Sequence, residues 1–388
     1  MKKNKFTLIL VAVYLVSLAV SFIVFSGLLK NFGDVTSPVP SAVTDGEKTL
    51  FDDSLPKTEA CPLSGQLFSK QQREWWEGHR PLGVMIENHD DARPQSGISK
   101  ADVVFEAVAE GGITRFLVVF YCQDAEFIGP VRSARTYFLD FISGYGEYPL
   151  YAHVGGANTP GKADALGQIR DYGWQNYNDM NQFSIGFPVF YRDYDRMGRT
   201  VATEHTMYSS TTKLWDYAAE ERGLTNVDEE GNEWNEDFTY YEFKDDAPAS
   251  ARPASQSISY NPWDGYGSYL VQWQYDKATN SYLRSNGGEA HVDLNNNEQL
   301  KAKNIVVLFM RESRANDGYE GNLHLLYGTT GSGKAVIFQD GKEIEGKWAK
   351  KNRVSPLLIT DDRGQEVEFN PGLTWFSVLP LEAPLEIE

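Results

Sequence analysis

The stretch Phe127-Ile-Gly-Pro-Val-Arg-Ser-Ala-Arg-Thr136 combines a turn signal, the start of a helix and two closely spaced arginines. Proline is tolerated in the first turn of a helix, because the N–H that it lacks would have no partner there. Apolar residues follow at helical spacing, namely Val131, Ala134, Phe138, Phe141 and Ile142. The stretch therefore predicts a helix that begins near Pro130.

The two arginines of this stretch lie where a helix least favours cations. Arg132 and Arg135 are three residues apart, so they would share a face in the first turns, with the hydroxyl of Ser133 beside them. A helix N-terminus already carries about half a positive charge, so two guanidinium groups there call for an anion. That anion is either a carboxylate of this chain or a group of an external ligand.

Apolar runs around this stretch predict strands that alternate with helices. Strands are expected at residues 82–87, 103–108, 114–121 and 149–154, with helices at about 160–170 and 209–222. This alternation is typical of an α/β or α+β layer. We therefore expect an α/β N-terminal domain over residues 61–226.

The second half of the chain has a different pattern. Residues 227–256 are acidic and end in proline, alanine and serine, which indicates a linker. From residue 257 to residue 388, short apolar runs are separated by Gly and Asp/Asn turns. Many short strands with such turns predict a mostly β C-terminal domain.

The N-terminus predicts a membrane anchor. Residues 1–5 are basic, and Phe6 to Leu29 is a run of 24 residues without a charge, whereas about 20 apolar residues span a bilayer. The lysines favour a cytoplasmic N-terminus, so the chain beyond residue 30 would be extracellular. We expect residues 1–30 to form a cytoplasmic tip and a single-pass signal anchor, followed by a disordered stalk over 31–60.

Charge and cysteine content exclude several classes of protein. A net charge of −18 argues against general nucleic-acid binding, which depends on basic surfaces. The sequence has no cysteine and histidine spacing typical of a zinc site, and we expect neither a metal nor a cofactor. In an oxidising compartment Cys61 and Cys122 either pair as a disulfide or remain unpaired thiols.

Several motifs together resemble the YerB-like family of bacterial extracytoplasmic proteins. In the first half these are Asn88, Ala92-Arg-Pro-Gln-Ser-Gly97, Ala101-Asp102, Glu106, Glu110-Gly-Gly-Ile-Thr-Arg-Phe116, Gly129-Pro-Val-Arg-Ser-Ala-Arg135, His153 and Gly155-Gly156. In the second half they are Gly331-Ser-Gly-Lys334, Asp340-Gly341, Gly346-Lys-Trp348, Asn370-Pro-Gly372 and Trp375. The resemblance implies an N-terminal and a C-terminal domain of unknown function. Several members look like lipoproteins, whereas we expect this chain to use an uncleaved anchor instead.

The motifs give a first hypothesis for the site, a binding pocket for an anionic or sugar-containing ligand of the cell envelope. Arg132, Ser133 and Arg135 would form its centre. The remaining candidates line it, namely Asn88, Arg93, Gln95, Arg115, His153, Gly155 and Gly156. The alternative interpretation makes these cations internal partners of Glu106 and Glu110, because buried charges must be paired.

Two other functions remain open from the sequence. Glu106 and Glu110 are four residues apart, so on a regular strand they share a face, where they could serve with His153 as catalytic residues of an envelope hydrolase or transferase. The protein could instead be a scaffold for a membrane protein partner, which would need none of these residues exposed.

Overall fold

The computed structural model describes residues 50–388, which form one compact unit. The expected membrane anchor at Phe6 to Leu29 and most of the expected stalk lie outside the described residues. Within residues 50–388, every helix is too short or too polar to cross a bilayer. The last residues of the expected stalk are ordered, because Lys57–Ala60 forms strand β1.

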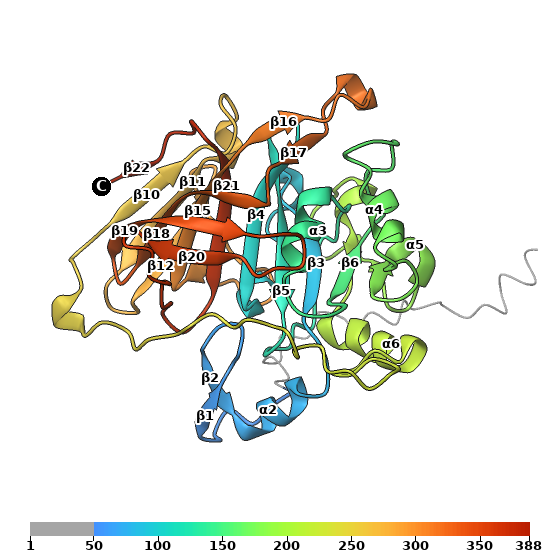
Figure 1. The fold of residues 1–388 in the computed structure, drawn as a ribbon, viewed down its shortest axis with the longest axis horizontal. Coiled ribbons are helices and arrows are strands. Elements are labelled where there is room, and N and C mark those ends of the chain that lie inside the picture. Colours follow the sequence, from blue (N-terminus) through green and yellow to red (C-terminus); the bar gives the residue numbers. More distant parts are fainter. Residues whose placement is uncertain (1–49) are drawn as a thin grey trace, which may run out of the picture. The chain divides into compact units, whose positions relative to one another are not determined.

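A ten-stranded sheet runs through both halves of the chain (Figure 1). Its strand order is β20-β19-β18-β15-β21-β4-β5-β3-β6-β7. From the first half it takes β3 (Leu82–Glu87), β4 (Val103–Glu110), β5 (Ile113–Phe120), β6 (Leu150–His153) and β7 (Asp179–Asn181). From the second half it takes β15 (Asn304–Met310), β18 (Gly331–Gln339), β19 (Lys342–Lys350), β20 (Leu358–Asp361) and β21 (Thr374–Pro380).

The smaller sheets complete the β-structure. A six-stranded sheet contains β10 (Ser257–Tyr260), β11 (Val271–Asp276), β12 (Ser281–Asn286), β13 (Glu289–Ala290), β14 (Lys301–Ala302) and β22 (Glu386–Ile387). Three two-stranded sheets pair β1 with β2 (Leu67–Ser69), β8 (Tyr191–Arg192) with β9 (Met207–Tyr208), and β16 (Glu312–Arg314) with β17 (Leu325–Tyr327).

The described helices are few and short. The α-helices are α2 (Lys70–Trp76), α3 (Thr136–Ile142), α4 (Ala165–Asp171), α5 (Gln182–Ile185) and α6 (Thr211–Arg222). The 3₁₀ turns are η1 (Asp90–Ala92), η2 (Ile98–Lys100), η3 (Thr203–His205), η4 (Ala249–Ala251), η5 (Gly267–Tyr269) and η6 (Tyr319–Gly321). The expectation of an α/β or α+β N-terminal domain is therefore wrong, because the described chain is mostly β-sheet.

Strand β21, the last strand of the large sheet in sequence order, joins the two halves. It lies between β15 and β4 and runs parallel to both, with Ser377 opposite Glu106. Strands on either side of residues 227–256 therefore hydrogen-bond within one sheet. The division into two domains with a linker between them stays a prediction.

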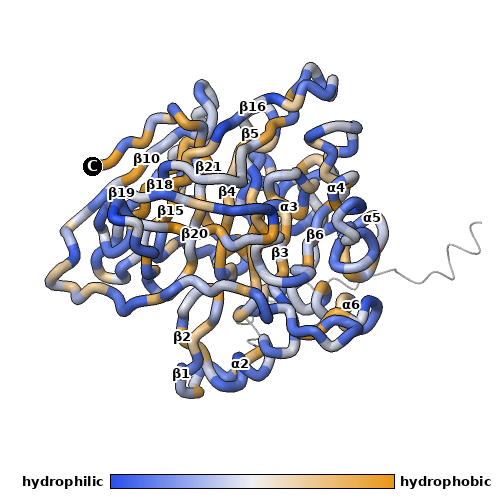
Figure 2. The backbone as a smooth tube through the Cα atoms, viewed as in Figure 1, coloured by the Kyte–Doolittle hydropathy of each residue, from blue (hydrophilic) through white to orange (hydrophobic). Residues whose placement is uncertain are grey.

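Each face of the large sheet is buried in its own core, and Figure 2 shows apolar residues concentrated along its strands. One core joins side chains such as Phe105 and Leu117 to α3 and α4. The other joins Val104 and Phe116 to α6 and to the inner face of the six-stranded sheet. Strands buried on both faces appear in the sequence as continuous apolar runs, which is why β3 was predicted with the bounds that it has in the structure.

The stretch before α3 is extended rather than helical. The backbone N–H of Val131 donates to Met207 at 2.7 Å, and that of Arg132 donates to Met85 at 2.8 Å. Helix α3 begins only at Thr136, so the prediction of a helix from Pro130 is wrong. These partners lie far away in sequence, and their hydrogen bonds outweigh the local helical spacing.

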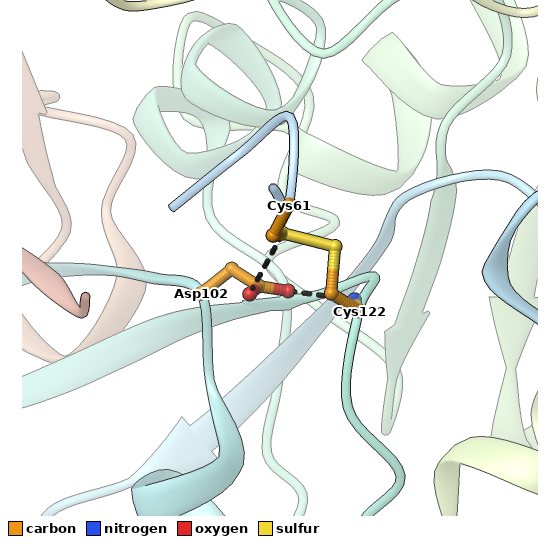
Figure 3. Close-up of side chains that lie close together, drawn as sticks. All are labelled: Cys61, Asp102 and Cys122. Carbon is orange, nitrogen blue, oxygen red and sulfur yellow. Dashed lines mark hydrogen bonds between the residues drawn. A yellow bond between two sulfur atoms is a disulfide. The ribbon is translucent and has the colours of Figure 1, made fainter. Parts of the chain in front are cut away.

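Cys61 and Cys122 form a disulfide in the structure, with their Cα atoms 5.9 Å apart. The buried carboxylate of Asp102 lies beside it (Figure 3) and accepts hydrogen bonds from the hydroxyl of Ser64 and the backbone N–H groups of Tyr121 and Cys122. Burial nevertheless raises the pKa of Asp102 to about 6, since these bonds offset only part of the desolvation cost.

Candidate functional site

A cavity of about 610 Å³, here called the Arg132 pocket, gathers four of the residues expected to bind a ligand. Arg132 and Ser133 meet Gly155 and Gly156 there, because the backbone N–H of Ala134 donates to Gly155 at 2.9 Å and that of Val154 to Arg132 at 3.1 Å. The pocket is lined by Val131, Arg132, Ser133, Val154, Gly155, Gly156, Asn158, Leu166, Phe183, Arg192, Thr203, Glu204 and Met207.

The Arg132 guanidinium is hydrogen-bonded through Nε and leaves its two terminal nitrogens without a partner among the described residues. Its Nε donates to the buried carboxylate of Glu87 at 3.1 Å, and its side chain is 29% exposed. The other oxygen of Glu87 accepts from Nδ1 of His205 at 2.8 Å, and this hydrogen bond raises the pKa of His205. Within residues 50–388, the two terminal nitrogens of Arg132 have no hydrogen-bond partner.

The other polar groups of the pocket are also partly free. Among the described residues, the hydroxyl of Ser133 and the amide of Asn158 have no hydrogen-bond partner. Arg192 is exposed and donates to Thr203. Glu204 is exposed on the same wall, and a hydrogen bond to its own backbone, followed by the charges of His205 and Arg132, lowers its pKa. The pocket therefore holds two cations and one exposed carboxylate.

Arg135 and Arg115 lie outside this pocket and share one carboxylate. Both donate to Glu110, and Arg135 also donates to the carbonyl of Ala134 at 2.6 Å. Their side chains are only 10% and 7% exposed, and burial lowers the pKa of each. These two arginines fit the alternative interpretation, in which cations of the motif are internal partners of an acid.

Asn88, Arg93 and Gln95 connect the first half of the chain to the second. Nε of Arg93 and the amide of Gln95 both donate to the side-chain oxygen of Asn88 at 2.9 Å. The Asn88 amide in turn donates to Asn286 at 2.9 Å, and Gln95 bonds to His291 at 2.7 Å. These hydrogen bonds occupy the groups that were expected to line a ligand pocket.

Glu106 is the carboxylate at the end of this network. It accepts hydrogen bonds from Arg284 at 3.0 Å, from Thr114 at 3.0 Å and from the indole N–H of Trp375 at 3.1 Å. Glu106 and Arg284 are 2% and 0% exposed, and the Arg284 guanidinium lies 4.5 Å from the centre of the Trp375 ring. The acid is therefore fully paired inside the protein.

Glu106 and Glu110 do not share a face of strand β4. The pairing of β4 with β5 shifts register between Val108 and Glu110, which is a β-bulge. The extra residue reverses the alternation, so Glu106 points to the six-stranded sheet while Glu110 meets Arg135 beside α3. The expectation of a shared face is wrong for this reason, and the two acids cannot act on one ligand.

His153 is held between two acceptors. Its Nδ1 lies 2.7 Å from the carbonyl of Gly155, and its Nε2 lies 2.6 Å from the carboxylate of Asp179. The side chain is fully buried. With both ring nitrogens occupied, His153 orients the loop at Gly155 and has no free position for proton transfer to a ligand.

The site residues expected from the sequence did not include four residues of the pocket region, namely Glu87, Phe183, Arg192 and His205. Glu87 ends a strand directly before the polar loop, and a charged residue at the end of a buried strand is a signal that could have identified it. The other three lie in residues 172–206, where the sequence has little periodicity. Only the fold brings them to Arg132.

Two described clusters have metal-ligand side chains: Cys61 with Asp102 and Cys122, and His89 with Asp91 and His205. In the first, the sulfurs are joined to each other, whereas a metal binds thiolates. In the second, the two rings stack at 5.0 Å and only 21° from parallel. A metal lies near the plane of each ring that binds it, so the two rings would have to turn relative to each other to hold one ion between them.

The matching family models, a similar protein and a solved structure all belong to one family. Residues 64–225 match the "Protein of unknown function (DUF3048) N-terminal domain", and residues 262–376 match the corresponding C-terminal domain. The chain is 32% identical over 343 residues to "Putative lipoprotein YerB" of Bacillus subtilis, covering 86% of this chain and 90% of that protein. The crystal structure of Bacillus subtilis YerB aligns with a TM-score of 0.67 and 28% identity, over 85% of this chain and 100% of that one.

Proposed function

The chain belongs to the YerB-like family with DUF3048 N- and C-terminal domains, and from the site geometry we propose that it binds an anionic group of a cell-envelope ligand in the Arg132 pocket. The relative from Bacillus subtilis is named "Putative lipoprotein YerB", which supports a membrane-associated, extracellular location. The disulfide between Cys61 and Cys122 is typical of the same oxidising environment.

The single observation that carries the proposal is the state of Arg132. Glu87 fixes the guanidinium through Nε alone, so among the described residues the two terminal nitrogens have no hydrogen-bond partner, on a side chain that is 29% exposed and belongs to the lining of the cavity. A guanidinium offers its terminal N–H groups as a fork that matches the oxygens of phosphate and carboxylate groups. Because Glu87 already holds the side chain in place, little rotamer entropy is lost when an anion binds.

The electrostatics of the pocket favour an anion only modestly, which suits a polymeric ligand with repeated weak contacts. Arg192 adds a second cation, whereas Glu204 opposes it. Each charge-assisted hydrogen bond contributes about 1.5–3 kcal/mol, which corresponds to roughly 10- to 150-fold in affinity. Exposed charges are screened by salt, so binding should weaken as the ionic strength rises.

The geometry does not support a hydrolase or transferase that uses Glu106 or Glu110 with His153. Each of the three residues is paired within the protein, and the two acids lie on opposite faces of β4. That the protein serves as a scaffold for a membrane protein partner stays a prediction.

The test is cosedimentation of the full chain with purified cell-wall sacculi, intact and after acid extraction of their anionic polymers. We expect binding to intact sacculi, a loss of at least tenfold in affinity for Arg132→Ala, and little binding to extracted sacculi. Arg170→Ala is the matched control, because it removes an exposed arginine of α4 outside the pocket. Equal binding of Arg132→Ala and wild type, with both folded by circular dichroism, would refute the proposal.

A further inference from the structure

An exposed aromatic ring forms one wall of the Arg132 pocket. Phe183 is 76% exposed and lines the cavity together with Arg132 and Gly155. A large apolar side chain that remains this exposed within a helix loses the benefit of burial. A ligand that covers the ring would recover it.

The backbone that carries the ring is joined to the loop at Gly155. The side-chain oxygen of Asn181 accepts a hydrogen bond from the N–H of Phe183 and another from the N–H of Gly155, both at 3.2 Å. Gly155 has φ +56°, and a Cβ atom there would lie 3.0 Å from the Phe183 ring. One asparagine therefore couples the aromatic wall to the loop that carries the pocket glycines, and the glycine lets the ring approach closely.

Other side chains that line the pocket are polar and have groups without a hydrogen-bond partner among residues 50–388. The Ser133 hydroxyl and the Asn158 amide supply both donors and acceptors, and the terminal nitrogens of Arg132 supply a fixed cation. The cavity of about 610 Å³ has room for roughly twenty water molecules at about 30 Å³ each. It is therefore larger than a lone phosphate or carboxylate needs.

One chemical class matches all three features. A pyranose ring has an apolar face of C–H groups, which suits the electron-rich face of an aromatic ring, and a rim of hydroxyls that both donate and accept. We infer that the pocket takes a sugar ring bearing an anionic group, with the ring on Phe183, the hydroxyls on Ser133 and Asn158, and the anion on Arg132. This inference rests on the proposed function, since it names the ligand class of the same site.

The test compares whole and partial ligands by isothermal titration on the full chain. The probes are N-acetylglucosamine 1-phosphate, glucose 1-phosphate and glucuronate, with inorganic phosphate and glucose as the two halves. We expect at least one anionic sugar to bind about tenfold more tightly than inorganic phosphate. The first two probes against glucuronate distinguish a phosphate-bearing from a carboxylate-bearing sugar.

Two phenylalanines make a matched pair of variants. Phe183→Ala should abolish the tenfold advantage of the sugar while leaving the affinity for inorganic phosphate unchanged. Phe187→Ala removes a ring that is equally exposed, at 75%, but does not line the pocket, and it should behave as wild type. Arg132→Ala should weaken the binding of every anionic probe.

The outcomes separate this inference from the proposed function. If inorganic phosphate and the sugars bind equally, or if Phe183→Ala retains the sugar advantage, the sugar assignment is wrong while the anion site stands. If Phe187→Ala loses as much as Phe183→Ala, the rings act as a general apolar patch and the assignment is also wrong. If Arg132→Ala binds the anionic probes as wild type does, both proposals fail.

Discussion

Glu106→Gln is expected to destabilise the protein strongly, although the change alters only one group. The carboxylate is the charged partner of Arg284, and both side chains are almost completely buried, at 2% and 0% exposed. Removing the negative charge leaves a guanidinium inside the protein without a counterion. One of its nitrogens, Nη1, already has no hydrogen-bond partner in the structure.

The magnitude follows from the burial of both partners. Breaking a buried ion pair by removing one partner costs about 3–5 kcal/mol, which is a large fraction of a typical stability of about 5–15 kcal/mol. The amide oxygen of glutamine can still accept from Arg284, and the aromatic rings around the guanidinium offer partial compensation. We therefore expect the lower end of this range, about 3 kcal/mol.

Urea denaturation followed by tryptophan fluorescence measures the effect. The double variant Glu106→Gln/Arg284→Met removes both charges, so it should lose at least about 1 kcal/mol less than the sum of the two single changes. Glu345→Gln is the matched control, because its pair with Lys334 lies at the surface with side chains 71% and 58% exposed, and its effect should be near zero. A loss below about 1 kcal/mol for Glu106→Gln, or full additivity in the double variant, would show that the reasoning from burial is incorrect.

Three further changes test other parts of the structure. Replacing Cys61 and Cys122 by alanine opens a loop of 61 residues, which in the chain-entropy model lowers the free energy of unfolding by about 4 kcal/mol. A loss under about 1 kcal/mol would contradict this expectation, and wild type measured with reductant is the control. The pKa of Asp102 is raised from 3.8 to about 6, so the stability that the protonated group adds is present at low pH and is lost between about pH 4 and 6. This decline is on the order of 3 kcal/mol, and urea titrations of Asp102→Asn across that pH range should not show it. The pKa of His205 is raised by its hydrogen bond to Glu87, so the stability that the protonated ring adds is complete below about pH 6.5 and falls as the pH rises above that value. The stability of His205→Gln should therefore approach that of wild type at high pH, and a difference that stays constant with pH would refute the assignment.

The sequence predicted strands better than helices because of where the side chains lie. Runs such as Leu82–Glu87 and Asn304–Met310 are buried on both faces, and their composition alone marks them as strands. Val131 and Ala134 have helical spacing, yet their backbone N–H groups bond to Met207 and Gly155, which no local pattern reveals. Long-range hydrogen bonds of this kind decide the conformation of the connecting segments.

The candidate site was only partly predictable, because contacts between distant segments decide which side chains remain open. Arg132, Ser133, Gly155 and Gly156 line one pocket, and the two glycines follow shortly after strand β6. The sequence could not distinguish Arg132 from Arg135, since only the fold shows that Glu87 leaves one cation open while Glu110 covers the other. A single extra residue in β4 likewise moved Glu110 away from Glu106, and no feature of the composition announces a bulge.

The position of β21 between β15 and β4 has a consequence for how the protein matures. A chain that leaves a ribosome or an export channel with its N-terminus first presents β4 and β15 long before residues 374–380 appear. Until then, both strands expose unpaired edges that can join other chains. Strand β21 is the last strand of the large sheet to arrive and closes it. A nascent protein that stalls before residue 374 should therefore be the species most prone to aggregation and most dependent on chaperones.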